Sequence, residues 1–175
     1  MNYVRSSSCR QDQIEGASLY PNNAPRWRKF LEPDILTATL AGEEIWTVLS
    51  IRAQLAGPNV SFNVVECTMF FLPTIFDFGW CLYAWDMHRK IINIFDPSYG
   101  NFTTQRRKNL LEAVADKLHV AFFSLIYKLF SNWKVDCIRW EKKIPRDIAH
   151  HSRTVSLLVY SRRLLISSAP HDNQI

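Results

Sequence analysis

The sequence of 175 residues has few of the features that mark several common classes of protein. It has only five glycines and four cysteines, and no two cysteines stand at the C-x-x-C spacing typical of a structural zinc site. No apolar stretch near the start resembles a signal peptide. We therefore predict free thiols in a reducing compartment, nuclear or cytoplasmic, and neither a metal nor another cofactor.

A membrane and a nucleic acid are both poor partners for this composition. The most apolar window, residues 67–85, is interrupted by Pro73 and Asp77. An Asp near the centre of a membrane span costs about 2.5–3.5 kcal/mol, so two buried strands explain the window better. The net charge is 21 − 16 = +5, but the basic residues are scattered along the chain. We therefore expect no membrane association and consider nucleic-acid binding unlikely.

Large apolar side chains, in contrast, are plentiful. Hydrophobic residues make up 47% of the chain, and they include eleven Phe, six Trp and six Tyr. That is enough for one domain with a substantial core. We predict a disordered leader at residues 1–26, one folded domain at 27–165 and a flexible tail at 166–175.

The hydrophobic pattern predicts a helix, a group of strands, a long helix and a further strand. We expect helices at 43–56 and 104–131, strands at 60–66, 68–73, 79–87, 91–96 and 134–140, a tight turn at 88–90 and a polar loop at 141–152. Residues 154–165 fit a strand or a helix. Glu43 and Glu44 suit the first turn of the first helix, where the helix dipole favours negative charge. The fold class is α+β, with a central, mostly antiparallel sheet and flanking helices.

The stretch 70–100 resembles the ubiquitin-like-protein-specific cysteine protease family, which includes the SUMO proteases. Phe71-Leu72-Pro73 resembles the family's first strand, Trp80 the Trp that opens its second, and Ile94-Phe95-Asp96-Pro97 its Asp-ended third strand. The similarity resumes at Pro145-Arg146 and at the apolar residues of 155–160. It covers roughly residues 60–165, with a weaker echo at 40–49. The resemblance implies a papain-like architecture.

Most catalytic positions of the family hold other residues here. The resemblance places the family's Asp at Asp96, its His at Gly79, its oxyanion-donating Gln at Asp147, its Asn-Gly pair at Ala149-His150 and its nucleophilic Cys at Arg153. The family's channel for a Gly-Gly tail implies that Trp80 has a binding role. Of the four catalytic groups, only Asp96 is retained.

These replacements remove the chemistry of a cysteine protease. Arg153 has no sulfur, and its guanidinium stays protonated, so it is not a nucleophile. Gly79 supplies no imidazole as base or acid, and Asp147 would repel the developing oxyanion. We therefore predict a pseudoprotease that retains some binding of a SUMO-type modifier. We also hypothesise that Arg153 pairs with Asp96 or Asp147.

Two other functions stay open at this point. Cys137 with His150 or His151 would make a non-standard thiol pair, and the chain would then be an active peptidase or isopeptidase. A small basic interaction domain unrelated to proteases is the third option. We expect Cys67 and Cys81 to be core residues. His88 fits a solvated turn, and His119 fits a packed or partly exposed helix position.

Overall fold

The computed structural model describes residues 28–58, 60, 63–76, 79–96 and 105–145. The leader, the tail and the ambiguous segment at 154–165 therefore lie outside the described residues. The elements in chain order are β1 (Arg28–Phe30), α2 (Asp34–Leu40), α3 (Leu49–Ala56), a short 3₁₀ helix (Val64–Glu66), β2 (Met69–Phe76), β3 (Gly79–Asp86), β4 (Ile91–Phe95), α4 (Gln105–Leu129) and β5 (Glu141–Lys143).

The five strands form one mixed sheet in the order β1-β2-β3-β4-β5. Its centre is antiparallel: Phe71 of β2 lies opposite Ala84 of β3, and Tyr83 lies opposite Ile94 of β4. The two short edge strands pair in parallel with their neighbours, β1 with β2 and β5 with β4. The α+β prediction is confirmed, and so are three strands, the long helix and the turn at 88–90.

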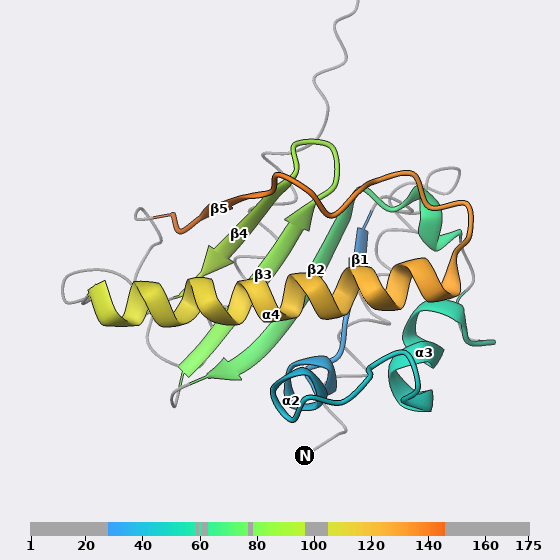
Figure 1. The fold of residues 1–175 in the computed structure, drawn as a ribbon, viewed down its shortest axis with the longest axis horizontal. Helices are drawn as coiled ribbons and strands as arrows, with labels where there is room; N and C mark the ends of the chain where they lie inside the picture. The colour runs from blue at the N-terminus through green and yellow to red at the C-terminus, as the bar shows by residue number, and fades with distance from the viewer. Residues whose placement is uncertain (1–27, 59, 61–62, 77–78, 97–104, 146–175) are drawn as a thin grey trace, which may run out of the picture.

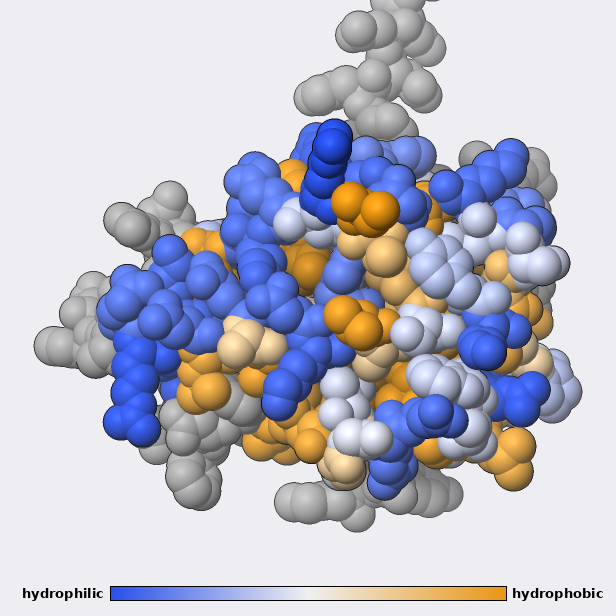
Figure 2. All heavy atoms as spheres, viewed as in Figure 1, coloured by the Kyte–Doolittle hydropathy of each residue, from blue (hydrophilic) through white to orange (hydrophobic). Residues whose placement is uncertain are grey.

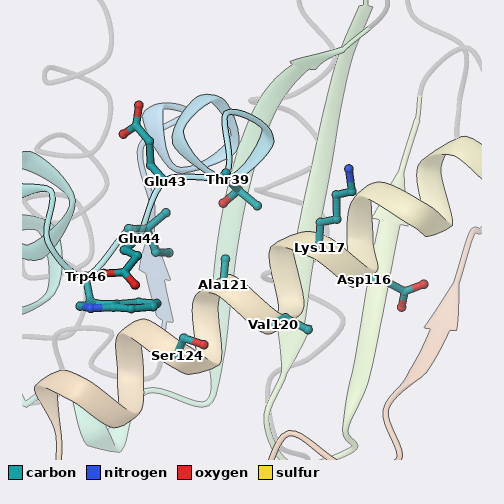
Figure 3. Close-up of a pocket in the computed structure, with 11 residues that line it drawn as sticks. Thr39, Glu43, Glu44, Trp46, Asp116, Lys117, Val120, Ala121 and Ser124 are labelled. Carbon is teal, nitrogen blue, oxygen red and sulfur yellow. The ribbon is translucent and has the colours of Figure 1, made fainter.

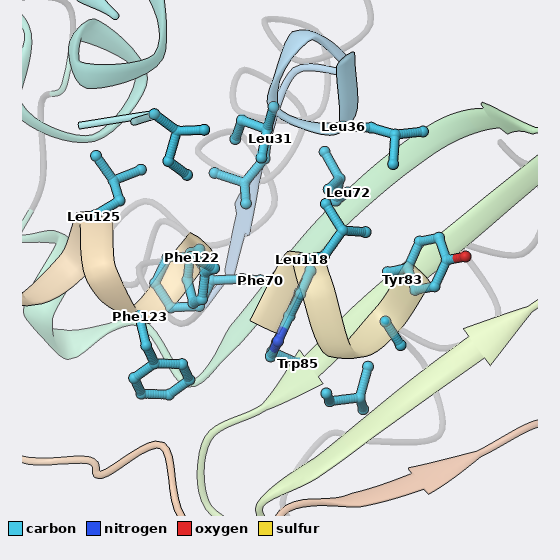
Figure 4. Packing of buried hydrophobic residues seen from close by; sticks show 14 of the residues in the cluster. Leu31, Leu36, Phe70, Leu72, Tyr83, Trp85, Leu118, Phe122, Phe123 and Leu125 are labelled. Atoms are coloured by element: carbon cyan, nitrogen blue, oxygen red, sulfur yellow. The ribbon is translucent and has the colours of Figure 1, made fainter. Parts of the chain in front are cut away.

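The main core lies between α4 and one face of this sheet. The helix crosses the strands, while α2 and α3 lie together near one end of them (Figure 1). Alternate strand residues such as Phe70, Tyr83 and Trp85 point toward α4, because successive side chains of a strand face opposite ways. Phe122 of α4 packs on Phe70 and on Trp85 with a centroid distance of 5.1 Å in each case (Figure 4). Aromatic packing thus fixes the helix on the sheet.

The opposite face of the sheet carries a second, smaller apolar cluster. Its buried members are Phe71, Leu82, Ala84 and Phe95. Phe30 of the edge strand β1 stacks on Phe71 with ring centroids 5.0 Å apart. Both faces of the central strands are therefore apolar, which explains why their sequences read as continuous hydrophobic runs rather than as strict alternation.

The first predicted helix begins later than expected. α3 starts at Leu49 because the backbone of Val48 is extended, and the residues before it form turns. Glu43 and Glu44 are consequently not in its first turn, and Leu49 is exposed rather than on an apolar face. Ile45 is fully buried from a turn. The hydrophobic pattern predicted one helix over both this turn and α3, and it did not predict α2.

Two of the predicted strands are also wrong where the structure describes them. Residues 64–66 form a 3₁₀ turn, capped by the Asn63 side chain, which accepts a hydrogen bond from the Val65 amide. Residues 134–140 form no strand, and β5 lies instead at 141–143, inside the predicted polar loop. In each case local hydrogen bonds satisfy the backbone without a neighbouring strand. The alternation of apolar residues alone could not reveal this.

Candidate functional site

The ends of two neighbouring strands bring Gly79 and Asp96 to one side of the sheet. β3 begins at Gly79, and β4 ends one residue before Asp96. The strands are antiparallel, with Leu82 opposite Phe95, so the start of one lies beside the end of the other. The structure thus brings together these two positions of the sequence-based site. At one of them there is no side chain at all.

Asp96 is completely buried and forms an ion pair with Arg107 in the first turn of α4. The guanidinium Nε donates to a carboxylate oxygen over 2.5 Å, and the Arg107 side chain is 18% exposed. Asp96 follows Ile92 and Ile94 on the face that packs against α4. A buried carboxylate needs such a partner, because an unpaired charge in the interior is strongly unfavourable.

Sequence reasoning missed the role of Arg107. The triplet 106–108 looks like a uniform basic first turn, which is an ordinary solvent-exposed pattern. In the structure Arg106 is exposed and Arg107 is partly buried. Only the helix phase distinguishes them: Arg107 lies four residues before Leu111, which is fully buried, so the two share a face. That spacing was the available signal.

Tyr83 lies close to this ion pair, and its phenol is not activated as a nucleophile. Burial raises the pKa of its hydroxyl well above the ordinary value, and the neighbouring Cys81 and Asp96 raise it further. Its buried hydroxyl has no hydrogen-bond partner among the described residues. On the adjacent strand, the Thr74 hydroxyl donates to the Cys81 carbonyl over 3.3 Å. A neutral phenol and a neutral hydroxyl supply no activated nucleophile.

The described thiols lie away from the Asp96 end of the sheet or are buried. Cys67 and Cys81 are core residues, as predicted, and burial raises the pKa of Cys67 to about 12. Cys137 is exposed between α4 and β5. The preceding residue, Asp136, is bound to Lys90 at the start of β4. The five residues of β4 span about 16 Å, so Cys137 is near the end of the strand opposite to Asp96.

Trp80 lies on the other face of the sheet. It alternates with Gly79 and Cys81, and it shares its face with Leu82 and Ala84, away from α4. Its side chain is 36% exposed, and it lies directly opposite Ile75, another exposed apolar residue on β2. Both apolar residues are therefore partly exposed at this end of the β2–β3 hairpin.

A groove of about 540 Å³ lies elsewhere, between the turns before α3 and the middle of α4. Trp46 and Glu44 face Ala121 and Ser124 across it (Figure 3). Among the residues that the structure describes, no cysteine or histidine lines this groove. In the wider view, hydrophilic residues cover most of the N-terminal half of α4, and apolar residues form separate patches (Figure 2). The groove therefore lacks the groups for thiol chemistry.

Several sequence-based positions lie outside the described residues. They are Asp147, Ala149, His150, His151 and Arg153, together with the hypothesised pairs of Arg153. Within the described part of the chain, no three His, Cys, Asp or Glu residues gather as a metal site would require. None of the described helices is long and apolar enough to span a membrane.

Comparison with known proteins gives a fold but no sequence family. No protein-family model matches the sequence, and no curated protein matches it either. Among solved structures, the crystal structure of a de-sumoylating protease aligns over 91% of this chain with a TM-score of 0.55 and 9% identity. This chain spans 59% of that protein's length. A Ulp1-like SUMO protease catalytic domain from Chaetomium thermophilum aligns over 78% of the chain and 48% of its own, with a TM-score of 0.44 and 13% identity.

Proposed function

We propose that this protein is a domain of the ubiquitin-like-modifier protease family that has lost catalysis and retains binding of a SUMO-type modifier. The observation that supports the proposal is the shared fold with a de-sumoylating protease, combined with the residues at the two neighbouring strand ends, Gly79 and Asp96. Asp96 holds an arginine there, and Gly79 offers no imidazole. An acid without a histidine to orient performs no role of a catalytic triad.

The path of the chain after β4 supports the alignment behind this proposal. β5 runs parallel to β4, with Ile91 opposite Glu141 and Asn93 opposite Lys143. The chain therefore travels from the Lys90 end of the sheet toward the Asp96 end. Asp147 follows Pro145 by two residues, which is at most about 7 Å of extended chain. This direction agrees with a site assembled from Asp96 and residues 147–153.

The ion pair between Arg107 and Asp96 is a second observation in favour of the proposal. In a working triad the carboxylate must accept a hydrogen bond from an imidazole. Here a carboxylate oxygen of Asp96 already accepts one from a permanently charged guanidinium. Introducing a histidine at Gly79 would thus place it beside a carboxylate whose charge is already compensated. The proposed loss of catalysis therefore involves the support of the site as well as its reacting groups.

Binding of the modifier is tested by NMR titration of the ¹⁵N-labelled protein with a mature SUMO-type modifier ending in Gly-Gly. We expect shifts around Trp80 and Ile75, and weaker binding of Trp80→Ala by about tenfold or more, as for an exposed aromatic anchor. Val120→Ala is the matched control, since Val120 is exposed on α4, across the sheet from Trp80. Absence of shifts at saturating modifier, or equal loss in both variants, contradicts modifier binding through this face.

An active thiol enzyme built on Cys137 is the second candidate, because Cys137 is an exposed free thiol. The geometry opposes it. Cys137 is near the Lys90 end of β4, whereas β5, at Glu141–Lys143, runs toward the other end. A dyad requires the thiol and imidazole within about 3 Å of each other. The Asp96 carboxylate, about 16 Å of strand away, could not orient such a pair.

A further inference from the structure

Residues 130–140 run back alongside α4 from its end to β5 (Figure 1), and we call this segment the strap. Contacts with α4 and with the turn before β4 hold it. The Tyr127 hydroxyl donates to the Val135 carbonyl over 3.2 Å, and Lys90 donates to Asp136 over 2.6 Å. Trp140 packs its ring against His119 and Phe123 of α4, with centroid distances of 5.1 and 5.4 Å. His119 is the one α4 residue that both packs and hydrogen-bonds to the strap in these contacts.

The hydrogen bonds of His119 specify its protonation state. Its Nδ1 accepts from the Trp85 indole N–H over 3.3 Å, and an indole nitrogen is only a donor. Its Nε2 lies 3.0 Å from the Cys137 carbonyl, which is only an acceptor. The ring must therefore be neutral, with its proton on Nε2. A second proton, on Nδ1, would point at the buried Trp85 N–H and remove that bond.

The strap is suited to local opening. Seven of its residues are exposed: Ser131, Asn132, Lys134 and the four from Asp136 to Arg139. Arg139 has a φ of 60°, a left-handed conformation that is unfavourable for a residue other than glycine. Exposed segments with stored backbone strain open at a lower free energy than the core. Phe130, Trp133 and Val135 anchor the first part of the strap on the core, whereas the part from Asp136 to Trp140 is mostly exposed. His119 contributes two contacts to that second part, one with the Cys137 carbonyl and one with the Trp140 ring.

We propose that protonation of His119 releases residues 136–140 of the strap from α4, so that the docking of this part is a pH-sensitive switch. The charged groups that face His119 are Asp116 on α4 and Lys142 on β5, which bind each other over 2.6 Å and so largely offset one another. The strap presents the Cys137 carbonyl and Trp140, and β3 presents Trp85. Burial lowers the pKa of His119 below its ordinary value, in agreement with this geometry.

The direction of the switch follows from linkage. The docked state requires neutral His119, and a more solvated ring in the open state binds a proton more readily. Docking is therefore complete above about pH 6.5 and weakens as the pH falls through that value toward the pKa of the docked ring. Each unit between the two pKa values increases the open-to-docked ratio by up to about tenfold. The switch does not depend on the proposed modifier-binding function.

Amide hydrogen exchange measured by NMR between pH 7.5 and 5.0 tests the proposal. The reporters are the Glu141 amide, bonded to Lys90 O, and the Ile138 amide, bonded to the Asp136 carboxylate. After correction for intrinsic exchange, we expect their protection to fall by about tenfold on acidification, while β3 amides keep theirs. His119→Gln keeps one acceptor and one donor but does not titrate, so it should abolish the change.

His88→Gln is the matched control, because His88 is a second histidine and is exposed in the turn before β4. It should leave the pH dependence intact. Three results would overturn the proposal. They are protection that does not change with pH in the wild type, an unchanged pH response in His119→Gln, and equal loss at the β3 amides, which would mean that the whole domain opens.

Discussion

Replacing Arg107 by methionine should destabilise the domain strongly, because it leaves the Asp96 carboxylate buried without its counterion. Removing one partner of a buried ion pair costs about 3–5 kcal/mol. Arg107 is 18% exposed, so water can reach part of the vacated space, and we expect the lower end, about 3 kcal/mol. For a chain of this length that corresponds to a Tm lower by about 6–12 °C.

Arg106→Met provides the matched control for this prediction. Arg106 belongs to the same helical turn but is exposed, so its substitution should change the free energy of unfolding by less than about 0.5 kcal/mol. Urea unfolding followed by circular dichroism measures both variants. The double variant Asp96→Asn with Arg107→Met should recover part of the loss, because no charge is then left buried. If Arg107→Met costs no more than Arg106→Met, the ion pair is not what stabilises Asp96.

Three further predictions concern the core, the thiols and pH. Phe122→Ala should lower the free energy of unfolding, measured in urea, by about 3–5 kcal/mol, because it removes a buried ring that packs on Phe70 of β2 and Trp85 of β3. Val120→Ala should change it little, because Val120 is exposed. Iodoacetamide at pH 8 should modify Cys137 and leave Cys67 intact by peptide mass spectrometry, since burial raises the pKa of Cys67 to about 12. The lowered pKa of His119 should reduce the free energy of unfolding as pH falls from about 6.5, and His119→Gln should remove that contribution in urea titrations at pH 7.5 and 5.5. Equal costs for the two core variants, faster labelling of Cys67, or identical pH profiles would each contradict the corresponding argument.

The strands and the long helix were predictable because their hydrophobic signals are strong and continuous. β2, β3 and β4 carry apolar residues on both faces, and α4 repeats them with helical spacing over its whole length. The region before β2 was not predictable in the same way. There, Ile45 is buried by a turn and Asn63 caps a 3₁₀ turn, and both depend on contacts distant in sequence or on side-chain bonds.

The candidate site was predictable only in part. Asp96 and Gly79 lie at neighbouring strand ends, because antiparallel pairing places the start of β3 beside the end of β4. The charge partner of Asp96 was not predictable from the motif, since Arg107 belongs to a helix whose phase depends on how it packs. The burial of His119 between Trp85 and the strap likewise arises from tertiary packing. A motif specifies which residues stand at a site but not which residues support them.

The proposed loss of catalysis means that this protein has no cysteine that works as a nucleophile, and a covalent probe tests this most directly. A SUMO-type modifier with a C-terminal vinyl sulfone traps a thiolate in a competent protease site, and an active de-sumoylating protease serves as positive control. We predict no adduct of this protein by intact mass spectrometry after prolonged incubation, alongside reversible binding of the unmodified modifier. An adduct on a cysteine that disappears in Cys137→Ala would contradict the account, because the chain would then possess a reactive thiol in a modifier-binding site.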